Sequence, residues 1–309
     1  MKTQLTLSQV LEGFELACQA RHLSPHTLAD YFNTFRKFCA YLVADPPFSA
    51  INLEQLRSFL GCQTVSNKTV LNYHTGLSAL WTWAVAEGLA PANLLHQVER
   101  PRPEQPALTI FSLADIKALL SALAQSRPYT RRGKAESDHA LPNPERNTAI
   151  ILLMLDTGLR VSELCDLRLN RLDVRNRRIT VWGKGSKERH IPFCPRTGQA
   201  LWKYLAAARK EARLDEPVFV TRTGRQMDRM EVLHMLATIG ARAGVSDVHP
   251  HAFRHTFAVN YLRNGGDIYT LQEILGHSSL EMVKRYLHVA QVDIDTTHRR
   301  ASPVDNWRL

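Results

Sequence analysis

The sequence has few cysteines, and their placement excludes two kinds of small-protein scaffold. Five cysteines are scattered through 309 residues. No two of them form a Cys-x-x-Cys pair or share the Cys/His spacing that holds zinc. An odd and scattered set predicts neither a disulfide framework nor a structural zinc site, and it favours a reducing cytoplasm. The five are Cys18, Cys39, Cys62, Cys165 and Cys194.

Long hydrophobic runs are also missing. No stretch approaches the roughly 18 consecutive apolar residues that a membrane-spanning helix needs. The N-terminal stretch MKTQLTLSQVLEGFELACQA is interrupted by Gln, Glu and Gly and contains no signal-peptide cleavage pattern. We therefore expect a soluble, unprocessed cytoplasmic protein with no membrane partner.

Acidic residues are outnumbered. The chain has 29 Asp and Glu against 39 Lys and Arg, a formal net charge of +10, which makes a polyanion the first partner to consider. Basic residues crowd one stretch of the second half, where a solvated charged face and a nucleic-acid surface are comparably good interpretations. The stretch contains Arg168, Arg171, Arg175, Arg177, Arg178, Lys184, Lys187 and Arg189.

Three prolines mark a boundary within the chain. Pro101, Pro103 and Pro106 forbid a continuous helix and favour an extended connector over residues 99–108. Residues 1–98 contain four helical patterns, at 5–20, 24–44, 52–62 and 66–89, and therefore predict a small all-helical domain. In the second pattern Ser24 is a suitable N-cap, and Pro25 suits the first helical position. Residues 109–309 form the second predicted domain.

The second domain mixes two periodicities. A helix is expected at 112–123, with Ser112 and Asp115 as its capping pair, and a long basic loop follows at about 124–145. Between residues 169 and 193 the period changes, since Ile179 and Val181 alternate with polar neighbours and glycines supply a turn, as in a small antiparallel sheet. Helical patterns resume at 197 and continue to 289.

Familiar catalytic motifs are absent, but four short segments of the second domain stand out. No Gly-rich P-loop precedes a helix, no HExxH occurs, and no Ser/His/Asp order suggests acyl transfer. The four segments are TGLRVSEL, VWGKGSKER, HPHAFRHTFA and LGHSSLEMVKRY. They contain Arg160, Glu163, Lys184, His251, Arg254, His277 and Tyr286.

This set of side chains suits phosphoryl transfer without a metal. Attack on an anionic phosphodiester builds charge on its equatorial oxygens, and forked arginine donors stabilise that charge. Histidine and lysine can move protons, and tyrosine can act as a covalent nucleophile.

Each segment also has a plain structural interpretation. Arg160 could simply bridge to Glu163, and Lys184 could be a solvated hairpin tip. His251 and His255 are four residues apart, but no further ligand pattern supports zinc. Tyr286 lies beside an apolar stripe at helical spacing, where a lone tyrosine is usually a core residue.

Taken together, the segments resemble the tyrosine recombinase (phage integrase) family. The likeness lies in Arg-x-x-Glu after Thr-Gly-Leu, a lysine in a β-turn, His-x-x-Arg, and Leu-Gly-His followed by a tyrosine nine residues after the histidine. It covers nearly the whole chain and is strongest to two-domain Xer-type members. It implies a mainly α fold, with a helical, SAM-like N-terminal domain that clamps DNA. The implied catalytic domain is α+β, with helices around a small antiparallel sheet.

The resemblance also implies roles for the matched residues. Tyr286 would attack the scissile phosphate and form a 3′-phosphotyrosyl link, with Arg160, Arg254 and His277 holding the phosphate. Lys184 would be the general acid, assisted by His251, and Glu163 would brace an arginine. The resemblance implies no cofactor, since the reaction needs neither ATP nor a metal.

The implied partners are double-stranded DNA with specific recombination sites and a homo-tetramer, or a tetramer with a related recombinase. Strand exchange would pass through a Holliday junction, and the DNA-bound protein would be associated with the nucleoid. The tail beyond Tyr286 has Val304, Trp307 and Leu309 as candidate residues for docking on a neighbouring protomer. Two alternatives stay open: a DNA-binding protein on the same fold without catalysis, and a type IB topoisomerase.

Overall fold

The chain forms two compact units, residues 1–106 and 107–309. The structure, a computed structural model, describes residues 4–104, 107–124, 143–182, 188–277, 279–290, 298 and 302–304. Lys184, most of the predicted 124–145 loop, Trp307 and Leu309 lie outside the described residues.

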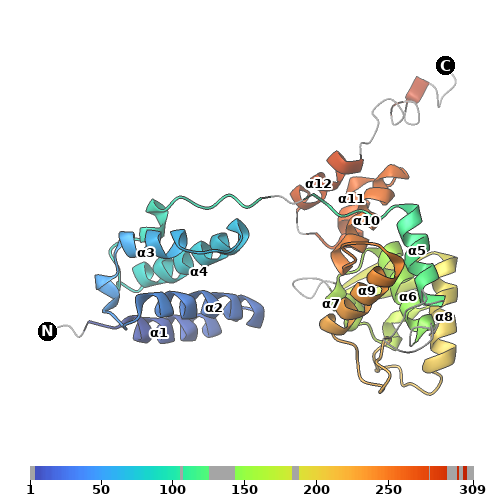
Figure 1. Cartoon of the computed structure of the whole chain (residues 1–309), viewed down its shortest axis with the longest axis horizontal. Helices are drawn as coiled ribbons and strands as arrows, with labels where there is room; N and C mark the ends of the chain where they lie inside the picture. Colours follow the sequence, from blue (N-terminus) through green and yellow to red (C-terminus); the bar gives the residue numbers. More distant parts are fainter. Residues whose placement is uncertain are drawn as a thin grey trace, which may run out of the picture. The chain divides into compact units, whose positions relative to one another are not determined.

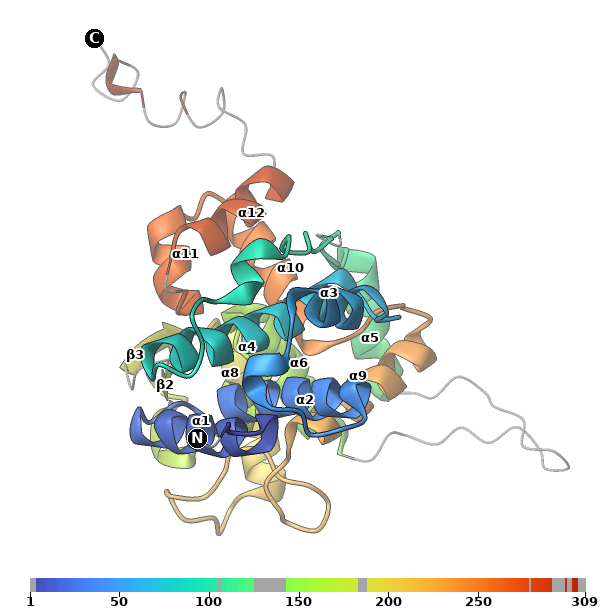
Figure 2. The same ribbon diagram turned by 90° about the vertical axis from the view of Figure 1, so that its left-hand side faces the viewer.

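The first unit is built from four α-helices: α1 (Leu7–Ala20), α2 (Pro25–Leu42), α3 (Leu53–Gly61) and α4 (Asn67–Ala86) (Figures 1 and 2). These agree with the four helical patterns in the sequence. The predicted cap of α2 is confirmed, because the Ser24 side chain accepts a hydrogen bond from the Thr27 amide and Pro25 opens the helix.

Aromatic side chains fill the core of this unit. Phe35 and Phe38 project from α2 and are almost fully buried, together with Phe59 of α3 and Trp81 of α4. The Phe38 and Phe59 rings meet edge to face with centroids 5.1 Å apart. This unit is therefore stabilised mainly by burial of apolar surface.

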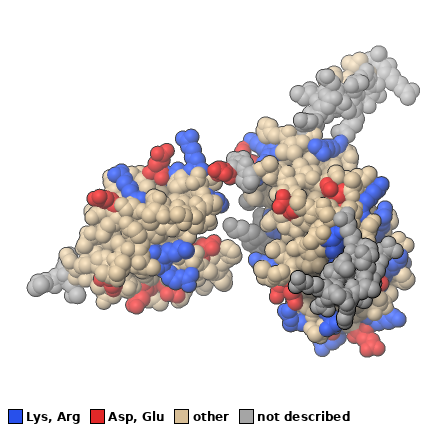
Figure 3. Space-filling view, in the orientation of Figure 1, with Lys and Arg blue, Asp and Glu red and all other residues tan. Residues whose placement is uncertain are grey.

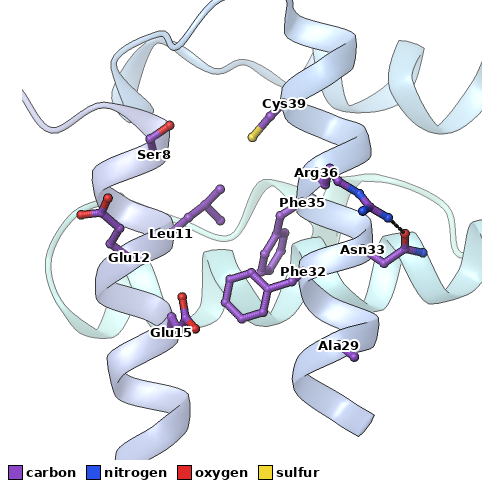
Figure 4. Close-up of a pocket in the computed structure, with 10 residues that line it drawn as sticks. All are labelled: Ser8, Leu11, Glu12, Glu15, Ala29, Phe32, Asn33, Phe35, Arg36 and Cys39. Carbon is purple, nitrogen blue, oxygen red and sulfur yellow. Dashed lines mark hydrogen bonds between the residues drawn. The ribbon is translucent and has the colours of Figure 1, made fainter. Parts of the chain in front are cut away.

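An open groove of about 510 Å³ lies between α1 and α2. Figure 4 shows Leu11, Phe32 and Phe35 pointing between the two helices, with Glu15 beside them. Arg36 turns aside to donate a hydrogen bond to Asn33 at 2.8 Å. The groove is thus apolar at its base and charged at its rim.

The second unit contains eight α-helices and three strands among the described residues. The first helices are α5 (Leu113–Ala124), α6 (Pro144–Thr157) and α7 (Val161–Cys165). The strands follow as β1 (Leu172–Asp173), β2 (Arg178–Trp182) and β3 (Glu188–Pro192). The later helices are α8 (Pro195–Ala208), α9 (Arg229–Ala243), α10 (Pro250–Arg263), α11 (Ile268–Leu275) and α12 (Glu281–Ala290).

The three strands form one antiparallel sheet in the order β1-β2-β3. Ile179 pairs with Ile191, and both are buried, while Val181 pairs with Arg189. The predicted alternation of Ile179 and Val181 is therefore confirmed. The predicted capping pair of α5 is confirmed as well, since Asp115 accepts from the Ser112 amide at 2.8 Å and Ser112 accepts from the Asp115 amide at 3.1 Å.

Helix α10 joins two apolar clusters of this unit. Ala252 and Phe253 belong to the large cluster around α6, whereas Ala258, Val259 and Leu262 pack against α11 and α12. Because α10 packs against both clusters, a buried polar residue on it is held in a fixed position. Arg254 is such a residue.

The predicted fold class, mainly α with a small antiparallel sheet in the second unit, is confirmed. Across the residues that the structure describes, no helix is both long and apolar enough to cross a membrane.

Candidate active site

A tight turn after α6 positions the first arginine. Gly158 ends α6 in the left-handed conformation, with φ of 60°. A Cβ at this position would come 2.5 Å from a ring carbon of Phe257, so the Thr-Gly-Leu turn requires glycine. Arg160 follows as the N-cap residue of α7. Its backbone N–H donates to Glu163 Oε2 and its Nη1 to Glu163 Oε1, both at 2.9 Å.

Glu163 also binds a second arginine. Arg189 of β3 donates from Nη2 to Glu163 Oε2 at 2.8 Å, and the carboxylate is nearly buried. Burial opposes ionisation of Glu163, but the hydrogen bonds from Arg189 and Arg160 outweigh it and hold the pKa of Glu163 below its usual value. An ionised Glu163 therefore links α7 to β3.

The C-terminus of α11 gathers three arginines. Gly276 closes this helix in a Schellman motif, in which the His277 amide donates to the Gln272 carbonyl and the Gly276 amide donates to the Glu273 carbonyl. The next three carbonyls, of residues 274, 275 and 276, accept from Arg189 Nε at 2.9 Å, Arg254 Nη2 at 2.7 Å and Arg160 Nη2 at 2.9 Å.

A helix C-terminus carries unpaired carbonyls and partial negative charge, so guanidinium groups are stabilised there. The close approach also explains Gly276. A Cβ at this residue would lie 2.8 Å from Arg189 Nη1. Residues 274–277, which include the Leu-Gly-His segment, thus set the positions of three arginines and of His277 at once.

Arg254 is the most buried of these arginines, with 3% of its surface exposed. Its Nη1 donates to the Gly158 carbonyl at 2.7 Å, so Arg254 holds the end of α6 and the end of α11 together. Burial lowers the pKa of Arg254 to about 10, and the neighbouring charge of Arg160 acts in the same direction. The group remains a cation at neutral pH.

Tyr286 lies on α12 within this polar surrounding and is 5% exposed. Its hydroxyl is 3.1 Å from Nδ1 of His255. The ring of His277 stacks on it, with centroids 6.3 Å apart and an interplanar angle of 19°. Burial raises the pKa of Tyr286, although Arg254 and Arg285 oppose that effect. The phenol is therefore protonated at neutral pH.

Both histidines beside Tyr286 are neutral at pH 7. Burial lowers the pKa of His277 to about 4, with Arg254 and Arg160 adding to the effect. Burial, followed by His251 and Arg285, lowers the pKa of His255 to about 4. His251 is exposed in the first turn of α10, and partial burial of its ring followed by the charge of Arg254 lowers its pKa too.

The structure brings together five of the seven residues singled out in the sequence: Arg160, Glu163, Arg254, His277 and Tyr286. His251 lies at their edge, with its ring centroid 6.3 Å from that of His255. Lys184 follows β2 in the sequence and lies outside the described residues. Tyr286 packs in the apolar cluster of α10, α11 and α12, so the core and nucleophile interpretations of this residue are compatible.

Two residues of the site, Arg189 and His255, were named in the sequence analysis but were not expected to belong to the site. Cross-strand partners share one face of a sheet, so a register that pairs Arg189 with the buried Val181 would have placed the arginine inward. His255 was noted only as a weak zinc partner for His251. The structure instead directs Nδ1 of His255 to the hydroxyl of Tyr286.

Basic side chains are spread over the visible face of the second unit with fewer acidic ones among them (Figure 3). At the end of β2, the Arg171 guanidinium lies over the exposed Trp182 ring, 5.2 Å from its centroid. Arg160, Arg171 and Trp182 all line one open cavity of about 500 Å³. Glu163 and Asp166 line the same cavity, so the surface next to the buried arginines is accessible and carries both signs of charge.

Comparison with known proteins agrees with this site. Residues 133–292 match the phage integrase family. Tyrosine recombinase XerC of Corynebacterium efficiens is 31% identical to this chain, over 96% of the chain and 93% of the relative. The XerC protein of Mycobacterium bovis is 30% identical, over 96% of the chain and 99% of the relative.

Solved structures show the same fold. The Tn1549 transposon integrase in complex with transposon right end DNA superposes with a TM-score of 0.73 at 20% identity, over 95% of this chain and 99% of that one. The XerH site-specific recombinase bound to a palindromic difH substrate superposes with a TM-score of 0.68 at 21% identity. The match covers 98% of this chain and 85% of that one.

Fold, site and relatives define the class as tyrosine recombinases, which are enzymes. Within that class, the chain belongs to the phage integrase family.

Proposed function

We propose that the protein is a site-specific recombinase that cuts and rejoins double-stranded DNA through a 3′-phosphotyrosyl intermediate. The observation that carries the proposal is the buried hydroxyl of Tyr286, held among Arg254, His277 and His255 in a chain of the tyrosine recombinase class. The integrase and XerH structures named above contain DNA, which supports DNA as the partner of this chain.

Arg160, Arg254 and His277 would bind the scissile phosphate. The two arginines are already oriented by backbone carbonyls and Glu163, so little reorganisation is needed when charge develops on the phosphate oxygens. Nδ1 of His277 is buried and has no hydrogen-bond partner among the described residues. A buried polar atom of this kind is satisfied when a ligand oxygen approaches it.

Tyr286 would attack the phosphorus while the 5′ oxygen leaves. Lys184 would protonate that oxygen, and His251, at the edge of the site, would assist the proton transfer. Because the phosphotyrosyl bond keeps the energy of the phosphodiester, the scheme needs no ATP, and the arginines carry the charge that a metal would otherwise balance. The 5′-hydroxyl of a partner strand then reverses the step, and repetition through a Holliday junction completes recombination.

In the same proposal, residues 1–98 clamp DNA, residues 99–108 are the linker, and residues 109–309 cleave. Four protomers would act together on two sites in the cytoplasm, at the nucleoid. The C-terminal tail would join neighbouring protomers. Deletion of residues 301–309 should then impair synapsis or the coordination of cleavage, and unchanged recombination by the shortened protein would exclude this docking role.

The test of the activity is a covalent adduct. A duplex selected by binding to the protein is nicked near the cleavage point, so that the short fragment diffuses away and the phosphotyrosyl product accumulates. A labelled protein–DNA band on a denaturing gel is expected for the wild type and for Tyr269→Phe, an exposed tyrosine of α11. It should be absent for Tyr286→Phe, which lacks the nucleophilic oxygen.

The outcomes separate the alternatives. Binding without any adduct in the wild type would leave a DNA-binding protein on the recombinase fold. Relaxation of arbitrary supercoiled DNA without strand exchange would favour a topoisomerase. Exchange between two selected sites, lost in Tyr286→Phe, supports the recombinase.

A further inference from the structure

His255 contacts the nucleophile, yet none of the roles above uses it. It follows Arg254 on α10, is partly buried, and has Nδ1 3.1 Å from the Tyr286 hydroxyl. The two rings are tilted by 49° with centroids 5.7 Å apart. A hydrogen bond therefore joins this imidazole to the atom that forms the bond to DNA.

Burial, more than the neighbouring charges, determines the protonation of His255 and Tyr286. The charges of His251, Arg285, His249 and Arg254 also act on His255, and each of them lowers its pKa. Partial burial, followed by these charges, keeps His255 neutral, and burial keeps the phenol of Tyr286 protonated. A neutral imidazole has one nitrogen with a free lone pair, and a neutral phenol has one proton to donate. The hydrogen bond at Nδ1 fits a phenol that donates to that lone pair.

Attack by Tyr286 requires the phenol to lose this proton. The three arginines of the site cannot accept it, because guanidinium groups are donors only. The scissile phosphate would bring a negative charge next to the pair, and an added anion favours the protonated form of an imidazole. DNA binding would thus make His255 a stronger base at the moment when the proton must move.

We propose that His255 is a catalytic residue that accepts the proton of Tyr286 during DNA cleavage, an inference that rests on the function proposed above. The O–H bond of Tyr286 breaks, and its proton moves to Nδ1 of His255. The phenolate oxygen forms the bond to phosphorus, and the bond from phosphorus to the 5′ oxygen breaks. The departing oxygen takes a proton from Lys184, and each transfer reverses when a 5′-hydroxyl attacks the phosphotyrosyl bond.

The main test compares two substitutions. His255→Asn places an amide near the position of Nδ1, which can keep a hydrogen bond to Tyr286 but cannot hold the proton. His255→Phe removes both functions. His234→Asn, an exposed histidine of α9, is the matched control. Adduct formation on the nicked duplex is followed in single turnover from about pH 6 to about pH 9, with DNA affinity and thermal unfolding measured for each variant.

For His255→Asn we expect cleavage to slow by about 10²-fold or more near neutral pH, the usual scale for loss of a general base. The rate of this variant should rise with pH, because hydroxide or water must then remove the proton, whereas the wild-type rate should be nearly flat. A wild-type rate and pH profile for His255→Asn would overturn the proposal. Equal losses in both variants with a flat pH profile would also overturn it, since His255 would then only pack.

A substrate with sulfur in place of the scissile 5′ oxygen distinguishes the base from the acid. Sulfur leaves without protonation, so this substrate should restore cleavage to Lys184→Ala but not to His255→Asn. Rescue of His255→Asn by sulfur would place His255 on the leaving-group side and overturn the proposal. Failure of the wild type to form any Tyr286 adduct would instead refute the proposed function itself.

Discussion

The two units of this protein bury different kinds of side chain. In the first, the buried residues of α2, α3 and α4 are largely aromatic and aliphatic, led by Phe38, Phe59 and Trp81. In the second, Arg254 is buried as deeply as the core residues, and Arg189 and Glu163 are nearly buried.

Burial of charge costs desolvation energy that apolar packing of the same volume does not, so a buried ionic network is weak evidence for stability. The first unit therefore owes its fold to apolar area. The second uses part of its interior to hold three arginines at fixed positions.

The largest effect is expected at Arg254. Arg254→Lys keeps the charge but cannot reach the Gly158 and Leu275 carbonyls with a planar fork, so the phosphate contact is misplaced. We expect the rate of adduct formation to fall by about 10³-fold, which corresponds to about 4 kcal/mol in transition-state stabilisation. Arg263→Lys, an exposed position at the end of the same helix, is the control. A loss of less than about tenfold at Arg254 would show that charge alone suffices.

The first unit should respond in stability instead. Phe38→Ala opens a cavity in the aromatic cluster, and we expect the unfolding free energy of this unit to fall by about 3 kcal/mol or slightly more. Chemical denaturation followed by tryptophan fluorescence measures the change, since Trp81 lies 6.4 Å from Phe38 between ring centroids. Leu16→Ala, an exposed position of α1, should cost less than about 0.5 kcal/mol. Similar losses for the two variants would contradict the assigned core.

A smaller effect is expected at Arg189, which acts through other residues. Arg189→Met removes the hydrogen bonds to Glu163 and to the Ile274 carbonyl, and Arg160 and His277 lose part of their support. We expect cleavage to slow by about 10- to 100-fold, as is usual for small displacements of catalytic groups. DNA affinity should change little, and Arg178→Met, at the exposed first residue of β2, serves as the control. A large loss of affinity with an unchanged cleavage rate would show direct phosphate binding by Arg189.

The mildest test uses pH and Glu163. Because the folded-state pKa of this carboxyl lies below its unfolded value, its contribution to stability is present above the unfolded pKa and is lost as the pH falls through the folded pKa. The unfolding free energy of the wild type should therefore decline on acidification, and Glu163→Gln should show a shallower decline. Urea titrations at a series of pH values measure both slopes. Identical slopes would mean that the arginines do not stabilise the ionised carboxylate.

Much of the fold could be predicted because its signals are local. The helices of the first unit follow from apolar stripes at helical spacing, and Ser24, Pro25 and Ser112 mark helix starts through contacts within three residues. The sheet was predicted from the alternation of Ile179 and Val181 with polar neighbours.

The site was predictable only in part. Arg160, Glu163, Arg254, His277 and Tyr286 were found by their order along the chain. The order of residues along the chain could not place Arg189 and His255 in the site, because their contacts are with residues far away in sequence. Arg189 is opposite Glu163 and the end of α11, and His255 is opposite a tyrosine 31 residues further on.

The sequence by itself determined the helices, the turn glycines and the set of chemically capable residues, since each depends on neighbours a few residues apart. Only the tertiary structure decided which groups share the interior and with what protonation. The C-terminus of α11 aligns three carbonyls that orient three arginines, and the packing of α10 against α12 sets His255 beside Tyr286. Desolvation and charge act through space, so the pKa values that matter for catalysis arise only when the chain has folded.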